Sequence, residues 1–162
     1  MRILGIDPGS RVTGIGIVDG HRLVAAFDLK LGGGDMPGRL SAIFDGIRDA
    51  IDAHRPDIVA IETAFMSRNP QAAIKLGQAR GAAICAAVQG GLEVHEYAPR
   101  LIKQALVGRG GADKEQVQHM VRMLLKTKEP FGADAADALA VALCHLHTAQ
   151  TAARMPAGVR LR

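Results

Sequence analysis

Four acidic residues stand at positions where the sequence leaves carboxylates little access to solvent. Asp7 follows the apolar run 3–6 and Glu62 follows the apolar run 58–61, so each is expected at the end of a buried strand. Open α/β sheets form their sites outside the carboxyl ends of their strands. Asp134 and Asp137 are three residues apart, which places them on one face of a helix, and they are the only acids between residues 131 and 147.

Parallel pairing of the strands that end at Asp7 and Glu62 would bring the two carboxylates together, since neighbouring strands lie about 4.8 Å apart. Two anions repel strongly in a low dielectric, so positive charge must lie between them. A cluster of carboxylates with few nitrogen or sulfur ligands suits a hard divalent cation such as Mg²⁺. Such clusters typically hold two cations about 3.5–4 Å apart for in-line attack on a phosphodiester.

Structural roles compete with this interpretation for three of the four acids. Asp134 could cap a helix, and Asp137 could then complete a capping box. Asp7 precedes Pro8 and Gly9, and aspartate commonly starts such turns. Glu62 has no comparable turn or capping role. Spacing alone does not show that the four acids converge.

Positive charge is concentrated in one segment of the chain. Residues 100–128 carry seven basic and two acidic residues, a net charge of +5, whereas the whole chain has +4. This pattern is expected for contact with a phosphate backbone, although a solvated helical face would give the same pattern. Lys103 and Lys114 flank the glycine-rich loop around Arg109, where a nucleic-acid backbone could approach closely.

Two further segments allow either a structural or a functional role. Phe65 lies in the loop 63–69 directly after Glu62, where it could stack on an unpaired base or fill the core. Gly77 and Gly81 are four residues apart in an alanine-rich helical segment. They could allow that helix to pack on a sheet, or to meet a second copy of the chain across a two-fold axis.

The elements that must position these residues follow from hydrophobic periodicity and turn signals. Three strands, 2–7, 12–19 and 22–30, form an antiparallel meander, and strands 57–62 and 92–97 follow later. Helices are expected over 37–54, 70–89, 99–106, 114–125 and 134–147. This order predicts an α/β fold with one five-stranded mixed sheet and helices on both faces. Residues 1–149 form a single domain, and the basic tail 150–162 is expected to be disordered.

Composition excludes several classes of protein. With 48% hydrophobic and 22% charged residues among 162, the chain is neither disordered nor unusually charged. No stretch approaches the roughly 18 apolar residues of a membrane span, and we expect no secretory signal, because the strand pattern begins at residue 2. Cys85 and Cys144 lie in Ala/Leu-rich runs and are expected to be buried and reduced. His145 and His147 lie on different helix faces and should not bind a metal together. A cytoplasmic protein is the expectation.

Several strings of the sequence together resemble the RuvC family of Holliday-junction resolvases. They are residues 5–10 (GIDPGS), 61–66 (IETAFM), 75–81 (KLGQARG), 117–121 (VQHMV) and 134–140 (DAADALA). The first string alone is weak, because actin-like ATPases and sugar kinases share an aspartate-glycine opening strand. The resemblance is specific because all five strings occur in the same order as in the family, over roughly residues 1–147.

The resemblance implies a ribonuclease H-like fold and a homodimer that cuts four-way DNA junctions by symmetric paired nicks, leaving 5′-phosphate and 3′-hydroxyl ends in recombination and repair. It implies four catalytic, metal-binding acids, two functional lysines and a stacking aromatic, which match Asp7, Glu62, Asp134, Asp137, Lys103, Lys114 and Phe65. Two Mg²⁺ per subunit are expected, with Mn²⁺ able to substitute. We also expect DNA contacts from Arg68, Arg80 and Arg109. A partnership with a branch-migration complex of the RuvA and RuvB type is implied, in a bacterial cytoplasm and on the nucleoid when bound to DNA.

Two other functions fit part of the sequence. Residues 7–10 could cradle a phosphate in an actin-like phosphotransferase, but such proteins need a second, duplicated domain that 162 residues cannot hold. A catalytically silent DNA-binding protein could use the basic segment. The four acids argue against it, because free carboxylates repel phosphates unless a metal ion is bound.

Overall fold

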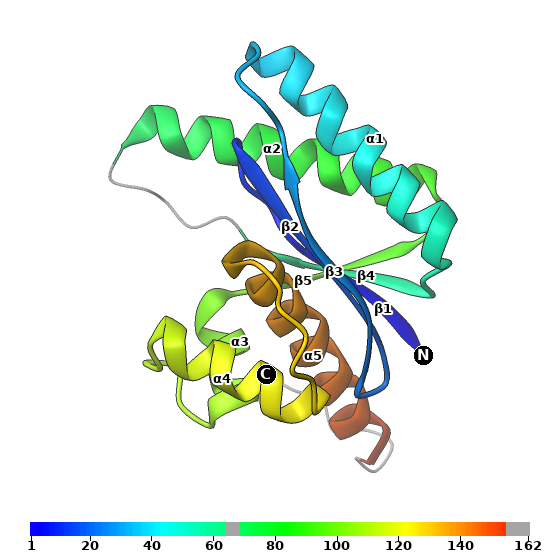
Figure 1. Ribbon diagram of the computed structural model, residues 1–162, viewed down its shortest axis with the longest axis vertical. Coiled ribbons are helices and arrows are strands. Elements are labelled where there is room, and N and C mark those ends of the chain that lie inside the picture. The colour runs from blue at the N-terminus through cyan, green and yellow to red at the C-terminus, as the bar shows by residue number, and fades with distance from the viewer. Residues whose placement is uncertain (64–68, 155–162) are drawn as a thin grey trace.

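The computed structural model describes residues 1–63 and 69–154, and it has one five-stranded mixed sheet in the order β3-β2-β1-β4-β5 (Figure 1). β1 pairs antiparallel with β2, which pairs antiparallel with β3, whereas β1, β4 and β5 are parallel neighbours. The predicted sheet is therefore confirmed. The strands are β1 (Arg2–Asp7), β2 (Val12–Asp19), β3 (Arg22–Lys30), β4 (Ile58–Glu62) and β5 (Glu93–Tyr97).

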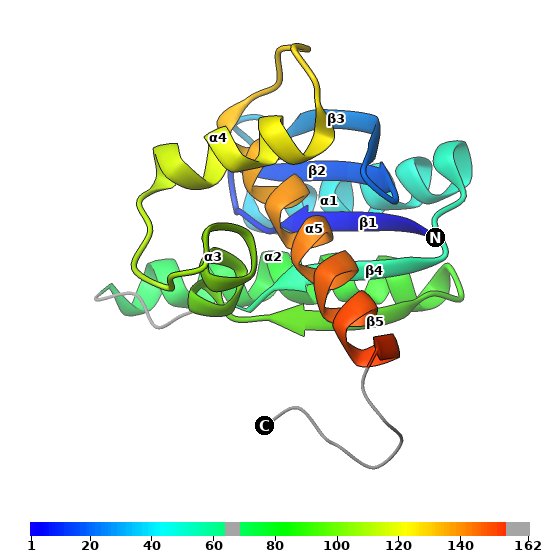
Figure 2. The ribbon, with the colours of Figure 1, turned by 90° about the horizontal axis from the view of Figure 1, so that it is seen from below.

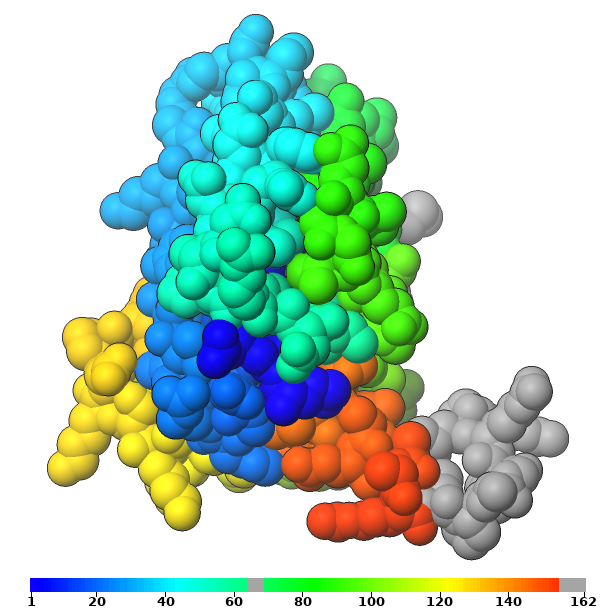
Figure 3. Space-filling view, turned by 90° about the vertical axis from the view of Figure 1, so that its right-hand side faces the viewer, coloured from blue at the N-terminus to red at the C-terminus, as the bar shows by residue number. Residues whose placement is uncertain are grey.

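Helices cover both faces of this sheet (Figure 2). One face is covered by α1 (Met36–His54) and α2 (Pro70–Gln89), which lie side by side in the space-filling view of Figure 3. The other is covered by α5 (Ala133–Arg154), with α3 (Pro99–Val107) and α4 (Lys114–Leu125) packed against it. Side-chain caps fix the start of α1 at Asp35, of α2 at Asn69 and of α4 at Asp113, which satisfies amide groups that a helix leaves unbonded.

The strands alternate their side chains between two hydrophobic cores. Leu4, Ile6 and Ile15 are fully buried against α1 and α2, whereas Ile3 and Val18 are fully buried against α5. Because successive residues of a strand point to opposite faces, this alternation determines which face receives each polar side chain at the strand ends.

Three glycines allow α5 to lie directly on the sheet. Gly5, Gly14 and Gly16 all face α5, and a Cβ at any of them would clash with the backbone or side chains of that helix. β1 pairs Gly5 with Gly16, so the glycines form a shallow track across neighbouring strands. Only a residue without a side chain permits so close an approach.

Two expectations and one alternative from the sequence are wrong or incomplete. α5 continues to Arg154 instead of ending at residue 147, so residues 150–154 are helical and not part of a disordered tail. Cys85 is exposed, whereas Cys144 is buried as expected. α5 begins at Ala133, with the Gly132 carbonyl accepting the bond from the Ala136 N–H, so Asp134 lies within the first turn and is not the cap.

The two histidines of α5 have separate structural contacts, as expected. His145 is buried and its Nδ1 lies 2.7 Å from the Tyr97 hydroxyl, with which it shares a hydrogen bond. The His147 Nδ1 lies 3.2 Å from the Ala105 carbonyl oxygen. Across residues 1–63 and 69–154, no helix is long and apolar enough to cross a membrane.

Candidate active site

The first two acids of the predicted cluster lie side by side at one edge of the sheet. β1 and β4 are parallel and pair Ile6 with Ile61, so Asp7 and Glu62 are level with each other one residue further on. Both side chains lie on the α5 face, because Gly5 and Ala60, two residues earlier, contact that helix. The parallel pairing assumed from the sequence is therefore confirmed.

The other two acids come to the same edge on the first turns of α5. Across the sheet Asp7 pairs with Gly14, and the Asp134 carbonyl rests against Gly14 so closely that a Cβ would not fit. Asp137, one turn later, lines a pocket together with Glu62. The glycine track therefore holds the acid-bearing part of α5 against the carboxyl ends of β1 and β4.

The pKa of Asp7 reflects how closely the four acids are gathered. This pKa rises from an ordinary 3.8 to about 7, mainly because the side chain is buried and then because of the negative charges of Glu62, Asp137 and Asp134, in that order, against the lowering effect of Lys114. Burial likewise raises the pKa of Glu62, and the charge of Asp137 adds to the effect. A buried carboxylate near like charges favours its protonated form.

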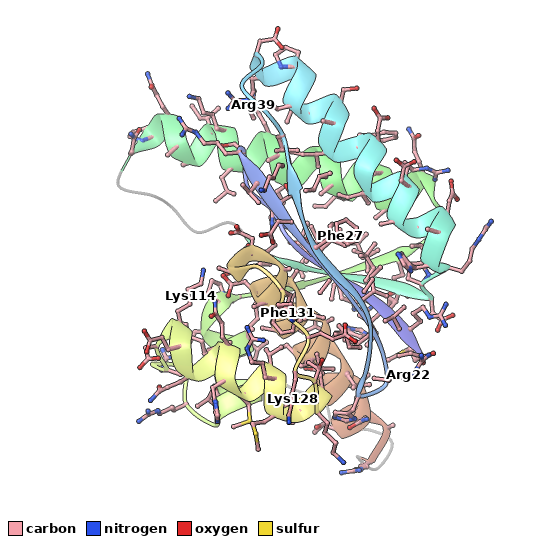
Figure 4. All side chains as sticks on the ribbon, in the orientation of Figure 1. Arg22, Phe27, Arg39, Lys114, Lys128 and Phe131 are labelled. Carbon is pink, nitrogen blue, oxygen red and sulfur yellow. The ribbon has the colours of Figure 1, made fainter. Side chains whose placement is uncertain are left out.

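Lys114 supplies positive charge to this cluster. From the first residue of α4, labelled in Figure 4, its Nζ lies 2.5 Å from Asp137 Oδ2. The hydrogen bond to Asp137 is the main reason that the pKa of Lys114 rises. The charges of Lys103 and Lys114 lower the pKa of Glu62. Both lysines line the pocket, of about 260 Å³, with Glu62 and Asp137.

The donor set fits a hard divalent cation. Oxygen is the donor atom in all four carboxylates, and clustered carboxylates in a partly buried site are typical ligands of Mg²⁺. Within the described residues, no three His, Cys, Asp or Glu side chains are already arranged to hold a metal ion. Instead the Lys114 ammonium bonds Asp137 Oδ2, so a cation at Asp137 would bind its other oxygen or displace this lysine.

The remaining predicted contact residues fall into three groups. Arg109 is exposed on the α3–α4 loop, close in sequence to the pocket-lining lysines. Arg80 forms an ion pair with Glu96, and Glu96 alternates with Tyr97 on β5, so it faces α2, away from the acids. Phe65 and Arg68 lie outside the described residues.

Sequence reasoning missed two features that shape the site. One is the placement of Gly14 beneath Asp134, for which a glycine within a strand pattern is the only signal. The other is Thr13, which is fully buried and whose hydroxyl donates to the Gly9 carbonyl at 3.0 Å. That bond closes the turn that follows Asp7, and a polar residue in an apolar strand was its only trace in the sequence.

Comparison with known proteins gives consistent matches over nearly the whole chain. Residues 3–145 match the family model of crossover junction endodeoxyribonuclease RuvC. The chain is 56% identical to the RuvC of Methylococcus capsulatus over 98% of both chains. It is 58% identical to that of Pelobacter propionicus, over 91% of this chain and 87% of the relative.

Solved structures agree with these matches. A structure of Thermus thermophilus RuvC in complex with Holliday junction substrate superposes with a TM-score of 0.87 at 38% identity, covering 94% of this chain and 96% of that one. The yeast mitochondrial Holliday junction resolvase Ydc2 shares the fold, with a TM-score of 0.69 at 10% identity over 94% of this chain and 80% of that chain. The ribonuclease H-like architecture expected from the resemblance is confirmed.

Proposed function

Because this chain belongs to the RuvC family of crossover junction endodeoxyribonucleases, we propose that it resolves four-way DNA junctions by metal-dependent hydrolysis at the cluster of Asp7, Glu62, Asp134 and Asp137. The observation that carries this proposal is the convergence of the four acids at one edge of the sheet, which the raised pKa of Asp7 supports. Four acids whose charges repel one another are unfavourable for folding alone, and a divalent cation relieves that repulsion.

We propose that the four carboxylates hold two Mg²⁺, for which Mn²⁺ can substitute. Bound cations there would supply an activated water and charge stabilisation for the departing 3′ oxygen. Water adds its oxygen to phosphorus, the bond from phosphorus to the 3′ oxygen breaks, and a proton passes to that oxygen. The products are a 5′-phosphate and a 3′-hydroxyl.

The lysines of the pocket have a separate role in this proposal. The raised pKa of Lys114 keeps its amine protonated at neutral pH. Were Asp137 to turn to a bound cation, the Lys114 ammonium would be freed toward the pocket that Glu62 and Lys103 also line. It can then balance the charge that gathers on the phosphoryl oxygens in the transition state. Lys103 and Arg109, with Phe65 and Arg68 of the segment after Glu62, would contact the DNA. Arg80 stays a weaker prediction for contact, since Glu96 already neutralises it.

A four-way junction is two-fold symmetric, so paired nicks require two copies of this site, and we propose a homodimer. The outward face of α2 supports it. Ile74 and Val88 are 62% and 59% exposed there, and a Cβ at Gly77 or Gly81 would meet no described atom within 4 Å beyond its chain neighbours and the nearby backbone of its own helix. The glycines therefore do not serve packing on the sheet, and a flat apolar helix face suits a self-complementary contact.

A charge on that face tests the dimer. Ile74→Arg should convert a dimer to a monomer in light scattering, and should leave single nicks where the wild type makes pairs. Met123→Arg on α4 is the matched control, because Met123 is 61% exposed on another helix. A wild type that is monomeric on junction DNA, or an Ile74→Arg protein that stays dimeric, would contradict the proposed interface.

The central experiment compares a synthetic four-way junction with a linear duplex of the same sequence. We expect Mg²⁺-dependent, symmetric nicking of the junction, none of the duplex, and none in EDTA. Nicking without added metal, or ATP turnover without DNA, would contradict the proposal.

We further propose that the enzyme acts in the bacterial cytoplasm, on the nucleoid, with a branch-migration complex of the RuvA and RuvB type, because its substrate is chromosomal DNA that such a complex moves.

A further inference from the structure

The helix that carries two of the acids has no cap of its own. The Gly132 carbonyl accepts the first helical bond of α5, from the Ala136 N–H at 3.0 Å, so Gly132 occupies the N-cap position. An N-cap side chain normally accepts a bond from the second or third amide of the helix. Glycine has no side chain to do so, and the first turn of α5, with Asp134 in it, depends on another residue.

Asp28 of β3 provides the missing acceptor. Its Oδ1 accepts a hydrogen bond from the Ala135 N–H, the third amide of α5, at 2.8 Å and across 107 residues of sequence. Its carboxylate occupies the space where any residue but glycine at position 132 would place a Cβ. The cap is therefore built from two elements, a carboxylate on the sheet and a glycine on the helix.

The sheet register aligns this cap with the acid cluster. Asp28 pairs with Gly14 on β2, and Gly14 pairs with Asp7 on β1. All three therefore lie in one row on the face that α5 covers, and the Asp134 carbonyl rests on the middle residue. The first turn of α5 is held between Asp28 on one side and the carboxylates of Asp7 and Glu62 on the other.

We propose that Asp28 is a positioning residue for the metal ligands Asp134 and Asp137. This inference rests on the proposed function of the four acids as a metal site. Without the bond from Ala135, the first turn of α5 loses its only described side-chain cap, and like charges on Asp7 and Glu62 push it outward. Asp134, within that turn, moves most. The cation affinity of the site should fall, although Asp28 itself ligates no metal.

The test compares Asp28→Ala, Asp28→Asn and Asp35→Ala. Asp35 is a matched control because it also caps a helix, accepting from the Gly38 N–H at 3.0 Å at the start of α1. Asp28→Ala should raise the half-saturating Mg²⁺ concentration for junction nicking about 10-fold or more, the effect typical of residues that orient metal ligands. Calorimetric binding of Mn²⁺ to the DNA-free protein should weaken to match. Asp28→Asn, whose amide oxygen can accept the same bond, should stay within about 3-fold of wild type.

Three results would overturn the proposal. They are wild-type Mg²⁺ dependence in Asp28→Ala, an equal change in Asp35→Ala, and an Asp28→Asn protein as impaired as Asp28→Ala. Hydrogen exchange distinguishes failure of the positioning role of Asp28 from failure of the proposed metal site. The amide of Ala135 should exchange faster in Asp28→Ala alone, whether or not the acids hold a metal. A wild type that binds no Mn²⁺ would refute the metal site, whereas unchanged exchange at Ala135 would refute the cap.

Discussion

Replacing Asp7 by asparagine should make the metal-free protein more stable while abolishing its activity. The pKa of Asp7 rises from 3.8 to about 7 in the folded chain, and each pKa unit is worth about 1.4 kcal/mol. An ionised Asp7 therefore costs folding at most about 4 kcal/mol. Asparagine has nearly the same shape and no charge, so the substitution removes that cost.

The pH dependence gives this prediction its sign. The unfolded chain loses the Asp7 proton near pH 4 and the folded chain near pH 7, so the folded state holds more protons between these values. Stability of the wild type then falls as the pH rises through this window. Asp7→Asn should match the wild type within about 1 kcal/mol at pH 4 and exceed it by roughly 2–4 kcal/mol at pH 8. For a chain of this length that is roughly 5–10 °C in melting temperature.

The assay is thermal and urea unfolding in EDTA at several pH values, with nicking and gel-shift assays on a four-way junction. Asp49→Asn, at an exposed position on α1, controls for the loss of one negative charge. Asp7→Asn should not nick but should still bind the junction, because binding rests mainly on cations and shape. A variant that is less stable than wild type at pH 8 would refute the argument that the acids are gathered at a cost in stability.

The other predictions concern the partners of the acids. Lys114→Ala should lower nicking at saturating junction by at least about 10-fold and change stability by less than about 1 kcal/mol, because Lys114 is 57% exposed. A large fall in melting temperature, or an equal loss of nicking in Lys128→Ala, would contradict this prediction. Gly14→Ala should lower the free energy of unfolding by about 1–3 kcal/mol and abolish most of the nicking activity, since its Cβ would meet the Asp134 carbonyl. Gly33→Ala, on an open loop, should change neither quantity. Mg²⁺ binding should release about half a proton from Asp7 at pH 7, where its pKa lies, and almost none at pH 9. Calorimetry in buffers of different ionisation enthalpy measures the number of protons released, and equal release at the two pH values would contradict this prediction.

Local signals in the sequence predicted most of the elements, and their success has a physical cause. The strands 2–7, 12–19 and 22–30 match β1, β2 and β3 because apolar runs and turn residues bound them sharply. α5 was predicted too short because residues 148–154 carry no apolar periodicity. They stay helical through alanine propensity, and the hydroxyls of Thr148 and Thr151 donate to carbonyls one turn earlier.

Burial on α2 could not be predicted, since small residues occur all round that helix. Cys85 and Val88 look as apolar as Ala83 and Ala87, yet the first two are exposed and the last two are fully buried. A hydrophobic stripe defines the buried side only when the opposite side is polar. The face of such a helix is decided by where its neighbours lie, and that information is not local.

The candidate site shows the same difference between local and non-local information. Each acid was visible in the sequence because it ends or interrupts an apolar run, and the meeting of Asp7 with Glu62 followed from the assumption that β1 and β4 are parallel neighbours. The row of Asp28, Gly14 and Asp7 was not visible, because it depends on the register of three strands and on the placement of a helix more than 100 residues away.

The glycine track also explains why the repulsion among the acids persists in the folded protein. A chain could relieve it by moving α5 outward, but the helix backbone rests on Gly5, Gly14 and Gly16, and lifting it would expose the core that Leu139 and Leu143 fill. Hydrophobic burial therefore holds the carboxylates together against their charge. Three means of relief remain, which are a proton on Asp7, the Lys114 ammonium on Asp137, and a divalent cation. A divalent cation would bring the most positive charge to the cluster, so the packing that builds this fold also favours the metal binding that we propose.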